Sequence, residues 1–214
     1  MSHFFDKRQK VYEEYAYILD YLPFGLGHGR REASRGPVAQ AIGEKFFMLL
    51  ELAPIPGLEL RVGDRVPLGR DLESQLLRVT RRLTYDELTA SAKAELPEII
   101  RQIVLQRERE FVEFFNKAEP LTTRMHSLEL LPGIGKRLLW KILEERKKKP
   151  FESFKDIYER IKIDPVKIIC ERILEELRTE QRHYLFVKPF HRPRLEFEER
   201  RGGSFGPRPP PSGA

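Results

Sequence analysis

The sequence predicts an α+β protein in which a small N-terminal β-barrel is followed by a C-terminal all-helical domain. Three observations lead to this prediction. Short apolar runs separated by Gly and Pro fill residues 11–84 and are typical of strands. From residue 85 onward apolar residues recur at three-to-four-residue spacing, which is typical of helices. A glycine turn at residues 131–137 then separates two helical stretches.

The barrel is expected within residues 1–84, where the apolar runs cover residues 11–22, 45–55, 58–69 and 75–83. Val62 and Val66 flank the pair Gly63-Asp64, which predicts a tight bend between short strands. Four or five such strands make a small barrel, with an OB-fold as the first choice and an SH3-like barrel as the second. The stretch 25–36 would be a long barrel loop.

Residues 85–120 are predicted to form a helical connector. Thr84 is followed three residues later by Glu87, a spacing that fits a capping box. Pro97 indicates two helices or a kink within the apolar pattern that runs to about residue 116. Residues 86–120 carry eight acidic and five basic side chains. We therefore expect this net-acidic connector to pack between the two modules or to form a dimer contact.

The helical domain is expected at residues 121–186, in four pieces at 125–130, 136–147, 154–161 and 165–179. Asp164 followed by Pro165 is a good helix start, because Asp caps the helix and Pro fits its first turn. The turn at 161–165 contains no glycine, so a second hairpin there would serve packing alone. Residues 187–214 are rich in Gly, Pro and Arg, and we expect a basic tail without fixed structure.

The heptapeptide Leu131–Arg137, LPGIGKR, is the sharpest motif. Its glycines let the backbone turn with no side chain in the way, so that N–H groups of the turn and of the next helix point at a phosphate oxygen. Residues 121–149 hold eight basic and three acidic side chains, a net charge of +5. The predicted nucleic-acid-binding residues are Gly133, Ile134, Gly135, Lys136, Arg137, Lys141, Lys147, Lys148, Lys149, and Arg30, Arg31 and Arg35 of the long loop. Two simpler interpretations remain open: a plain helix–turn–helix joint, and a lysine run that only solvates a helix end.

Other site chemistries are not predicted. The single cysteine, Cys170, rules out an internal disulfide and a cysteine zinc cluster, and it is expected in the core. The five histidines show no metal-ligand spacing, and no phosphate-binding P-loop is present. We expect no catalytic residue, no metal and no cofactor. No apolar run is long enough for a membrane helix, and the first ten residues lack the apolar core of a signal peptide, so a cytoplasmic protein without membrane contact is expected.

LPGIGK resembles the turn of the helix-hairpin-helix families of DNA repair, recombination, transcription and ribosome-associated proteins. Many members have a small residue where Leu139 stands, and Trp140 follows it here, so helix packing is expected to differ. The whole chain resembles an archaeal family, number 655 among the domains of unknown function, whose members are described as predicted OB-fold and helix-hairpin-helix nucleic-acid binders. The resemblance implies a non-catalytic RNA-binding protein linked to translation or ribosome biogenesis. DNA of the repair or recombination type is the alternative ligand, and a scaffold for ribosomal or transcription proteins is the alternative function.

Overall fold

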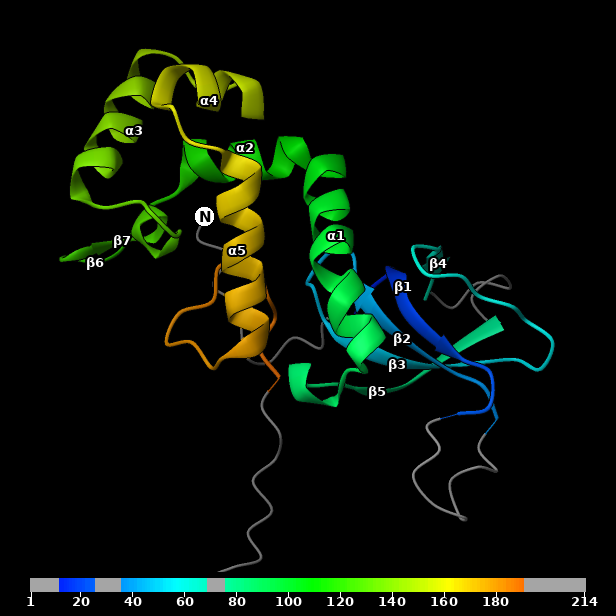
Figure 1. Cartoon of the computed structure of the whole chain (residues 1–214). Helices are drawn as coiled ribbons and strands as arrows, with labels where there is room; N and C mark the ends of the chain where they lie inside the picture. Colours follow the sequence, from blue (N-terminus) through cyan, green and yellow to red (C-terminus); the bar gives the residue numbers. More distant parts are fainter. Residues whose placement is uncertain (1–11, 26–35, 69–75, 191–214) are drawn as a thin grey trace, which may run out of the picture.

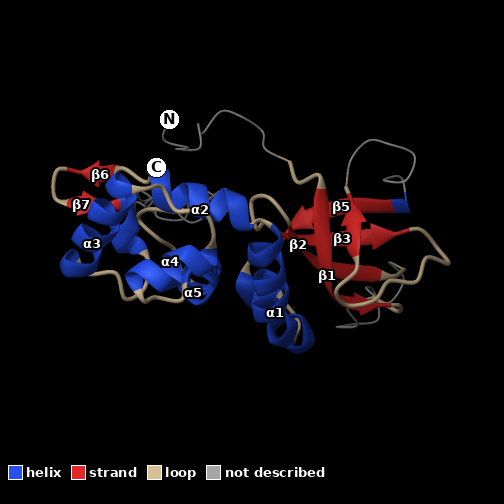
Figure 2. Ribbon diagram, turned by 90° about the horizontal axis from the view of Figure 1, so that it is seen from above, coloured by secondary structure: helices blue, strands red, loops and turns tan. Residues whose placement is uncertain are grey.

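The computed structural model describes residues 12–25, 36–68 and 76–190. A curled sheet and a group of helices lie side by side, with the long helix α1 (Ala90–Gln106) between them (Figure 1, Figure 2). The predicted α+β class and the order of its two parts are therefore confirmed. The predicted loop residues Arg30, Arg31 and Arg35 lie outside the described residues.

The sheet contains β1 (Tyr15–Leu22), β2 (Val38–Gly43), β3 (Leu49–Pro54), β4 (Arg65–Pro67) and β5 (Leu77–Arg82). Their spatial order is β4-β1-β2-β3-β5, and every neighbouring pair is antiparallel. Because β4 and β5 occupy opposite edges, the described sheet is a curled half-barrel, which agrees with the predicted small barrel in its strand number and curvature but is not closed within the described residues. Closure depends on a pairing between strands distant in sequence, which no local pattern specifies.

Two local strand predictions also differ from the structure. Strand β2 was missed because Ala39, Gln40 and Ala41 do not make an apolar strand pattern, although pairing with β1 and β3 buries all three. The bend at Gly63 is present, with φ +88°. Its N-terminal side is not a strand, and β4 pairs with β1 instead. The bend is held by hydrogen bonds from Gly63 N–H to Ile18 O and from Ile18 N–H to Asp64 O.

The sheet is apolar on both faces, because successive side chains of a strand point to opposite sides. On β1, Ala16 and Ile18 join a small cluster, whereas Tyr17 and Leu19 join a larger one. The larger cluster also holds residues of α1, of α2 (Glu108–Lys117) and of the helical domain. The two parts of the protein therefore share one hydrophobic core, and the connector packs between them, which is the first of its two predicted roles.

The connector contains a short 3-10 helix η2 (Tyr85–Glu87) before α1. The predicted capping box is present, since the Glu87 carboxylate accepts a hydrogen bond from Thr84 N–H at 2.8 Å. Two helices follow as expected, but the junction is at Arg107 and Pro97 lies inside α1. Arg107 fixes the junction by donating to the carbonyls of Glu44 and Lys45 and by pairing with Glu110 at 2.8 Å.

The helical domain contains a small ribbon of β6 (Pro120–Thr122) and β7 (Met125–His126), followed by the 3-10 helix η3 (Ser127–Leu130). The helices α3 (Lys136–Lys148), α4 (Phe154–Ile161) and α5 (Pro165–Arg178) come next. The four predicted pieces are confirmed to within two residues at each end, although the first is a 3-10 turn. Asp164 caps α5 by accepting from Lys167 N–H at 3.0 Å. The ribbon was not predicted, because strands of three and two residues leave no periodic pattern.

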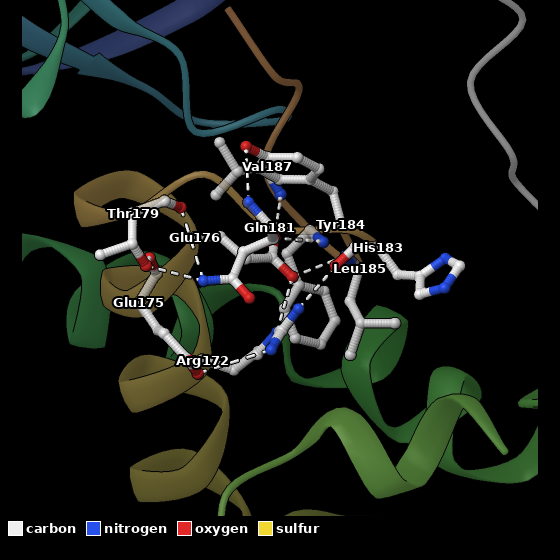
Figure 3. A network of polar contacts seen from close by, with 10 residues as sticks. Arg172, Glu175, Glu176, Thr179, Gln181, His183, Tyr184, Leu185 and Val187 are labelled. Carbon is white, nitrogen blue, oxygen red and sulfur yellow. Dashed lines mark hydrogen bonds and ion pairs between the residues drawn. The ribbon is translucent and has the colours of Figure 1, made fainter. Parts of the chain in front are cut away.

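A buried polar network holds the segment after α5 (Figure 3). The Glu176 carboxylate accepts from the backbone N–H groups of Leu185, Phe186 and Val187 at 2.6–3.0 Å, and from Arg172 Nε at 2.8 Å. Arg172 also donates to the carbonyl of His183 at 2.6 Å. Through these contacts one carboxylate at the end of α5 organises the chain that follows it.

The tail was predicted to begin at residue 187, but residues 187–190 are packed against the sheet. Val187 is buried, and the N–H of Lys188 donates to Phe46 O at 3.0 Å. Arg82 on β5 donates to the carbonyls of Lys188 and Pro189. The remaining residues of the predicted tail, 191–214, lie outside the described part.

Candidate nucleic-acid interface

The glycine motif forms a tight turn between η3 and α3. Leu131 and Ile134 are buried on its inner side, and the N–H of Ile134 donates to Leu131 O at 3.1 Å. Gly133 has φ +78°, a left-handed conformation that favours glycine, whereas Gly135 is extended and serves as the N-cap of α3. The predicted turn is therefore present, anchored from inside by two apolar side chains.

The outer side of this turn is open. Gly133 and Gly135 are both exposed, and a Cβ placed on either would meet no atom within 4 Å. The first N–H groups of a helix have no intrahelical partners. No side chain caps those of α3, so they remain open. Backbone N–H groups at an open helix start attract anions, because the helix dipole adds a positive partial charge there.

The interior of the domain holds the turn and α3 in place. Leu128 of η3 and Ile142 of α3 are fully buried, and Leu139 is nearly so. All three belong to the larger core cluster. The large Leu139 side chain, at a position where a small residue is common in similar hairpins, is accommodated in this core. The hairpin thus rests on packed apolar side chains, which keeps its backbone donors in fixed positions.

The cations next to the turn differ in whether their side chains already contact other groups of the protein. Lys136 pairs with Glu129 at 2.8 Å and donates to Arg124 O at 3.1 Å. Lys141 donates to the carbonyl of Ile161 at 3.2 Å. Arg137 is exposed, and no ion pair or hydrogen bond of its side chain is found within the described residues. Of the cations predicted beside the phosphate site, Arg137 is therefore the one most available to a ligand.

The second basic cluster lies at the far end of α3. Lys147 is about 12 residues from Gly135, or about 18 Å along the helix axis. Lys148 pairs with Glu145 at 2.7 Å and Lys149 with Glu152 at 3.0 Å. The structure therefore does not bring this cluster to the hairpin. Arg146, part of the same basic run, turns inward to the carbonyls of Phe115 and Ala118.

Sequence reasoning did not count two exposed residues of this region among the binding residues. Trp140 on α3 is 62% exposed. Arg124, in the turn of the β6–β7 ribbon, is exposed close to Lys136. A helical projection of residues 136–148 would have placed Trp140 on the outer face, opposite Leu139 and Ile142, so the signal was present in the sequence. The position of Arg124 depends on the unpredicted ribbon.

A buried histidine caps η3, the 3-10 helix that leads into the turn. His126 Nδ1 accepts from the N–H of Leu128 at 3.1 Å, and the N–H of His126 donates to the Glu129 carboxylate. Burial lowers the pKa of His126, Arg146 lowers it further, and Glu129 opposes both. The Lys136 ammonium, through its hydrogen bond, and the N–H of His126 hold the pKa of Glu129 below its usual range.

We expect acid to weaken the fold at His126. Because the folded-state pKa lies below the unfolded value of roughly 6.5, this contribution to stability is complete above that pH and is lost as the pH falls toward the folded pKa. Protonation places a hydrogen on Nδ1 and ends its acceptance from Leu128. Urea unfolding midpoints of wild type and His126→Asn, measured from about pH 8 to about pH 5, should converge or cross as the pH falls, since the Asn oxygen accepts at every pH. Parallel curves would show that His126 does not titrate in this way.

Other candidate chemistry is sparse in the described residues. Cys170 is partly buried against the core, as predicted, and burial raises the pKa of its thiol to about 12. Within residues 12–25, 36–68 and 76–190, no group of His, Cys, Asp and Glu is placed to hold a metal ion. None of the helices described is both long and apolar enough to span a bilayer.

The described fold defines a class of protein in which a curled five-stranded antiparallel sheet shares its core with a helical domain that presents a glycine turn. The chain belongs to the family called protein of unknown function DUF655, which it matches over residues 12–188. It is 45% identical to an uncharacterised protein, MJ0038, of Methanocaldococcus jannaschii, over 86% of this chain and 83% of that protein. The crystal structure of Af1531 from Archaeoglobus fulgidus, of the same family, is similar with a TM-score of 0.75 and 45% identity, covering 82% of this chain and all of the other. The family resemblance drawn from the sequence is confirmed.

Proposed function

We propose that this protein is a non-catalytic, cytoplasmic nucleic-acid-binding protein that grips a phosphate group with the turn Gly133–Gly135 and the start of α3. The observation that carries the proposal is the open, uncapped helix start beside two exposed glycines. A phosphate oxygen placed there would accept hydrogen bonds from backbone N–H groups, with Arg137 and Lys136 adding charge. Such contacts position a ligand without reading its sequence.

RNA is the preferred ligand in this proposal, in a role connected with translation or ribosome biogenesis. The preference comes from the family resemblance alone, since a phosphate grip suits RNA and DNA equally. We also propose that the half-barrel derives from an OB-like barrel, which its five strands and partly open curl support. The hairpin itself is proposed to be of the helix-hairpin-helix kind, although η3, a four-residue 3-10 helix, stands in the place of the first helix.

The test uses Gly135, because its conformation accepts any residue and its surroundings are empty. Asp and Asn are both good N-cap residues and have nearly the same shape. Gly135→Asp places a carboxylate where the phosphate would lie, whereas Gly135→Asn does not. We expect Gly135→Asp to weaken binding roughly 10- to 150-fold, the equivalent of one lost charge-assisted hydrogen bond of about 1.5–3 kcal/mol. Gly135→Asn covers the same N–H groups without the negative charge, so it should lose less affinity than Gly135→Asp.

Affinities are measured by anisotropy with fluorescein-labelled RNA and DNA duplexes of one sequence, across a salt series. Wild-type affinity should fall steeply with salt, as phosphate contacts require. The better ligand distinguishes RNA from DNA. Equal binding by Gly135→Asp and Gly135→Asn would contradict the phosphate grip. If wild type binds neither nucleic acid, the proposed function is wrong, and a scaffold that docks proteins on its acidic connector becomes the hypothesis to pursue.

A further inference from the structure

We infer that Trp140 is a stacking platform for an unpaired base next to the phosphate held by the hairpin. This inference rests on the proposed function and refines its ligand. The ligand would be a nucleic acid with a single-stranded portion beside the gripped phosphate, and a blunt duplex would use the hairpin alone. Bases stack on exposed aromatic rings in a sequence-tolerant way, because every base presents a flat π-face.

The first observation is the exposure of the indole. Trp140 is the only tryptophan of the chain, and 62% of its surface is accessible. No aromatic ring or cation among the described residues stacks on it, whereas Tyr15 and Tyr85 are each covered by an arginine. Covering a large apolar ring that is exposed to water with a flat partner is favourable. Packing within the described fold therefore does not account for the position of Trp140.

The second observation is the charge around Trp140. Successive helix residues are about 100° apart, so the outward face of α3 carries Trp140 with Arg137 one turn earlier and Lys147 two turns later. Both cations are exposed, and neither has a side-chain partner among the described residues. Glu144, one turn after Trp140, is the acidic residue on this face. An aromatic ring between free cations suits a base with its phosphates better than an apolar or basic protein surface.

The third observation is distance. Trp140 follows Gly135 by five residues, or about 7.5 Å along the helix axis. One strand of a nucleic acid rises about 3.4 Å per nucleotide, so the ring lies about two nucleotides from a phosphate at the turn. A strand held at the hairpin and running along α3 would thus reach the level of Trp140 within about two nucleotides.

Tyr158 provides a matched control. It is 55% exposed on α4 and belongs to the same domain. Two contacts identify the side of α3 that faces α4. Glu145 pairs with Arg160, and Lys141 donates a hydrogen bond to Ile161 O. Trp140 lies about 100° from Lys141 on the helix and away from α4. A ligand on the outer face of α3 should therefore not contact Tyr158.

The experiment uses a short blunt RNA duplex and the same duplex with a single-stranded adenosine overhang. Fluorescence of Trp140, excited selectively, reports stacking directly because the chain has no other tryptophan. We expect the overhang duplex to quench this emission and the blunt duplex to change it little. Trp140→Ala should bind the overhang duplex about 5- to 150-fold more weakly, the equivalent of one base stacked at about 1–3 kcal/mol. Trp140→Phe should recover part of the loss, and Tyr158→Ala should bind as wild type does.

The outcomes separate this inference from the proposed function. The stacking role alone would be overturned if binding depends on the hairpin but the overhang duplex leaves Trp140 emission unchanged and binds Trp140→Ala as tightly as wild type. If Trp140→Ala loses the same affinity for both duplexes, the ring does not distinguish unpaired bases, and the stacking role is overturned as well. Absence of all binding by wild type would instead refute the phosphate grip on which the inference rests.

Discussion

Replacing Glu176 by Gln should lower the free energy of unfolding by about 3–5 kcal/mol. The carboxylate is buried and accepts from three backbone N–H groups as well as from Arg172. The amide keeps the shape, but its NH₂ group must face donors on one side, and the charge that balances buried Arg172 is lost. A buried cation and backbone donors without acceptors are both costly. Urea unfolding followed by circular dichroism measures the change.

Glu175→Gln is the control for this prediction. Its side chain is 48% exposed and lies 3.4 Å from Arg172, so its loss should cost less than about 1 kcal/mol. The double variant Arg172→Met, Glu176→Leu removes both charges but leaves the three N–H groups of residues 185–187 without acceptors. It should therefore stay well below wild type in stability. A double variant as stable as wild type would show that the ion pair, and not the backbone hydrogen bonds, determines the stability lost in Glu176→Gln.

Gly43→Ala is expected to destabilise the protein by a similar amount, about 3–5 kcal/mol. A Cβ at residue 43 would lie 2.1 Å from the Cδ and Oε1 atoms of Glu13. That carboxylate is buried and accepts from the N–H groups of Lys45, Phe46 and Met48 at 2.9–3.2 Å. The added methyl group must displace it, which leaves three backbone donors unsatisfied at the turn between β2 and β3. Thermal and urea unfolding of the purified variant check the value.

The double variant Glu13→Ala, Gly43→Ala tests the cause. If Gly43→Ala acts by expelling the Glu13 carboxylate, removing that carboxylate first should make the second substitution nearly harmless, so the two effects should not add. Strict additivity would mean that Gly43 is needed for a reason other than space for Glu13. Gly57→Ala, where a Cβ meets nothing within 4 Å, reports the cost of a left-handed conformation alone.

The helical domain could be predicted closely because its signals are local. Asp164-Pro165 begins α5, and the glycine turn separates η3 from α3, each within a few residues of sequence. The sheet was harder to predict because its strands are defined by their neighbours. Strand β2 is recognisable only once β1 and β3 lie on either side of it. No local sequence pattern indicates that β4 and β5 form the two edges of the sheet.

The candidate site was predicted in its backbone but not in its side chains. The exposed turn at Gly133 and Gly135 follows directly from the motif. Net charge was a poorer guide, because Arg146 is used internally and Lys148 and Lys149 are paired with glutamates. Counting charge along the sequence cannot distinguish a cation that caps a helix from one that faces solvent. Trp140 was present in the helical pattern, but the proposal of a role for it rests on its exposure in the structure.

The bonds between Glu176 and residues 185–187 have a consequence for folding during synthesis. All five strands of the sheet precede residue 83, so their pairing can begin early in translation. The face of the sheet that carries Tyr17 and Phe47 is covered by a core that includes Ile169, Ile173 and Val187. Val187 is held in that core by a glutamate eleven residues before it. A nascent chain therefore exposes part of this apolar face until residue 187 has been released, and it should be most prone to aggregation in that interval.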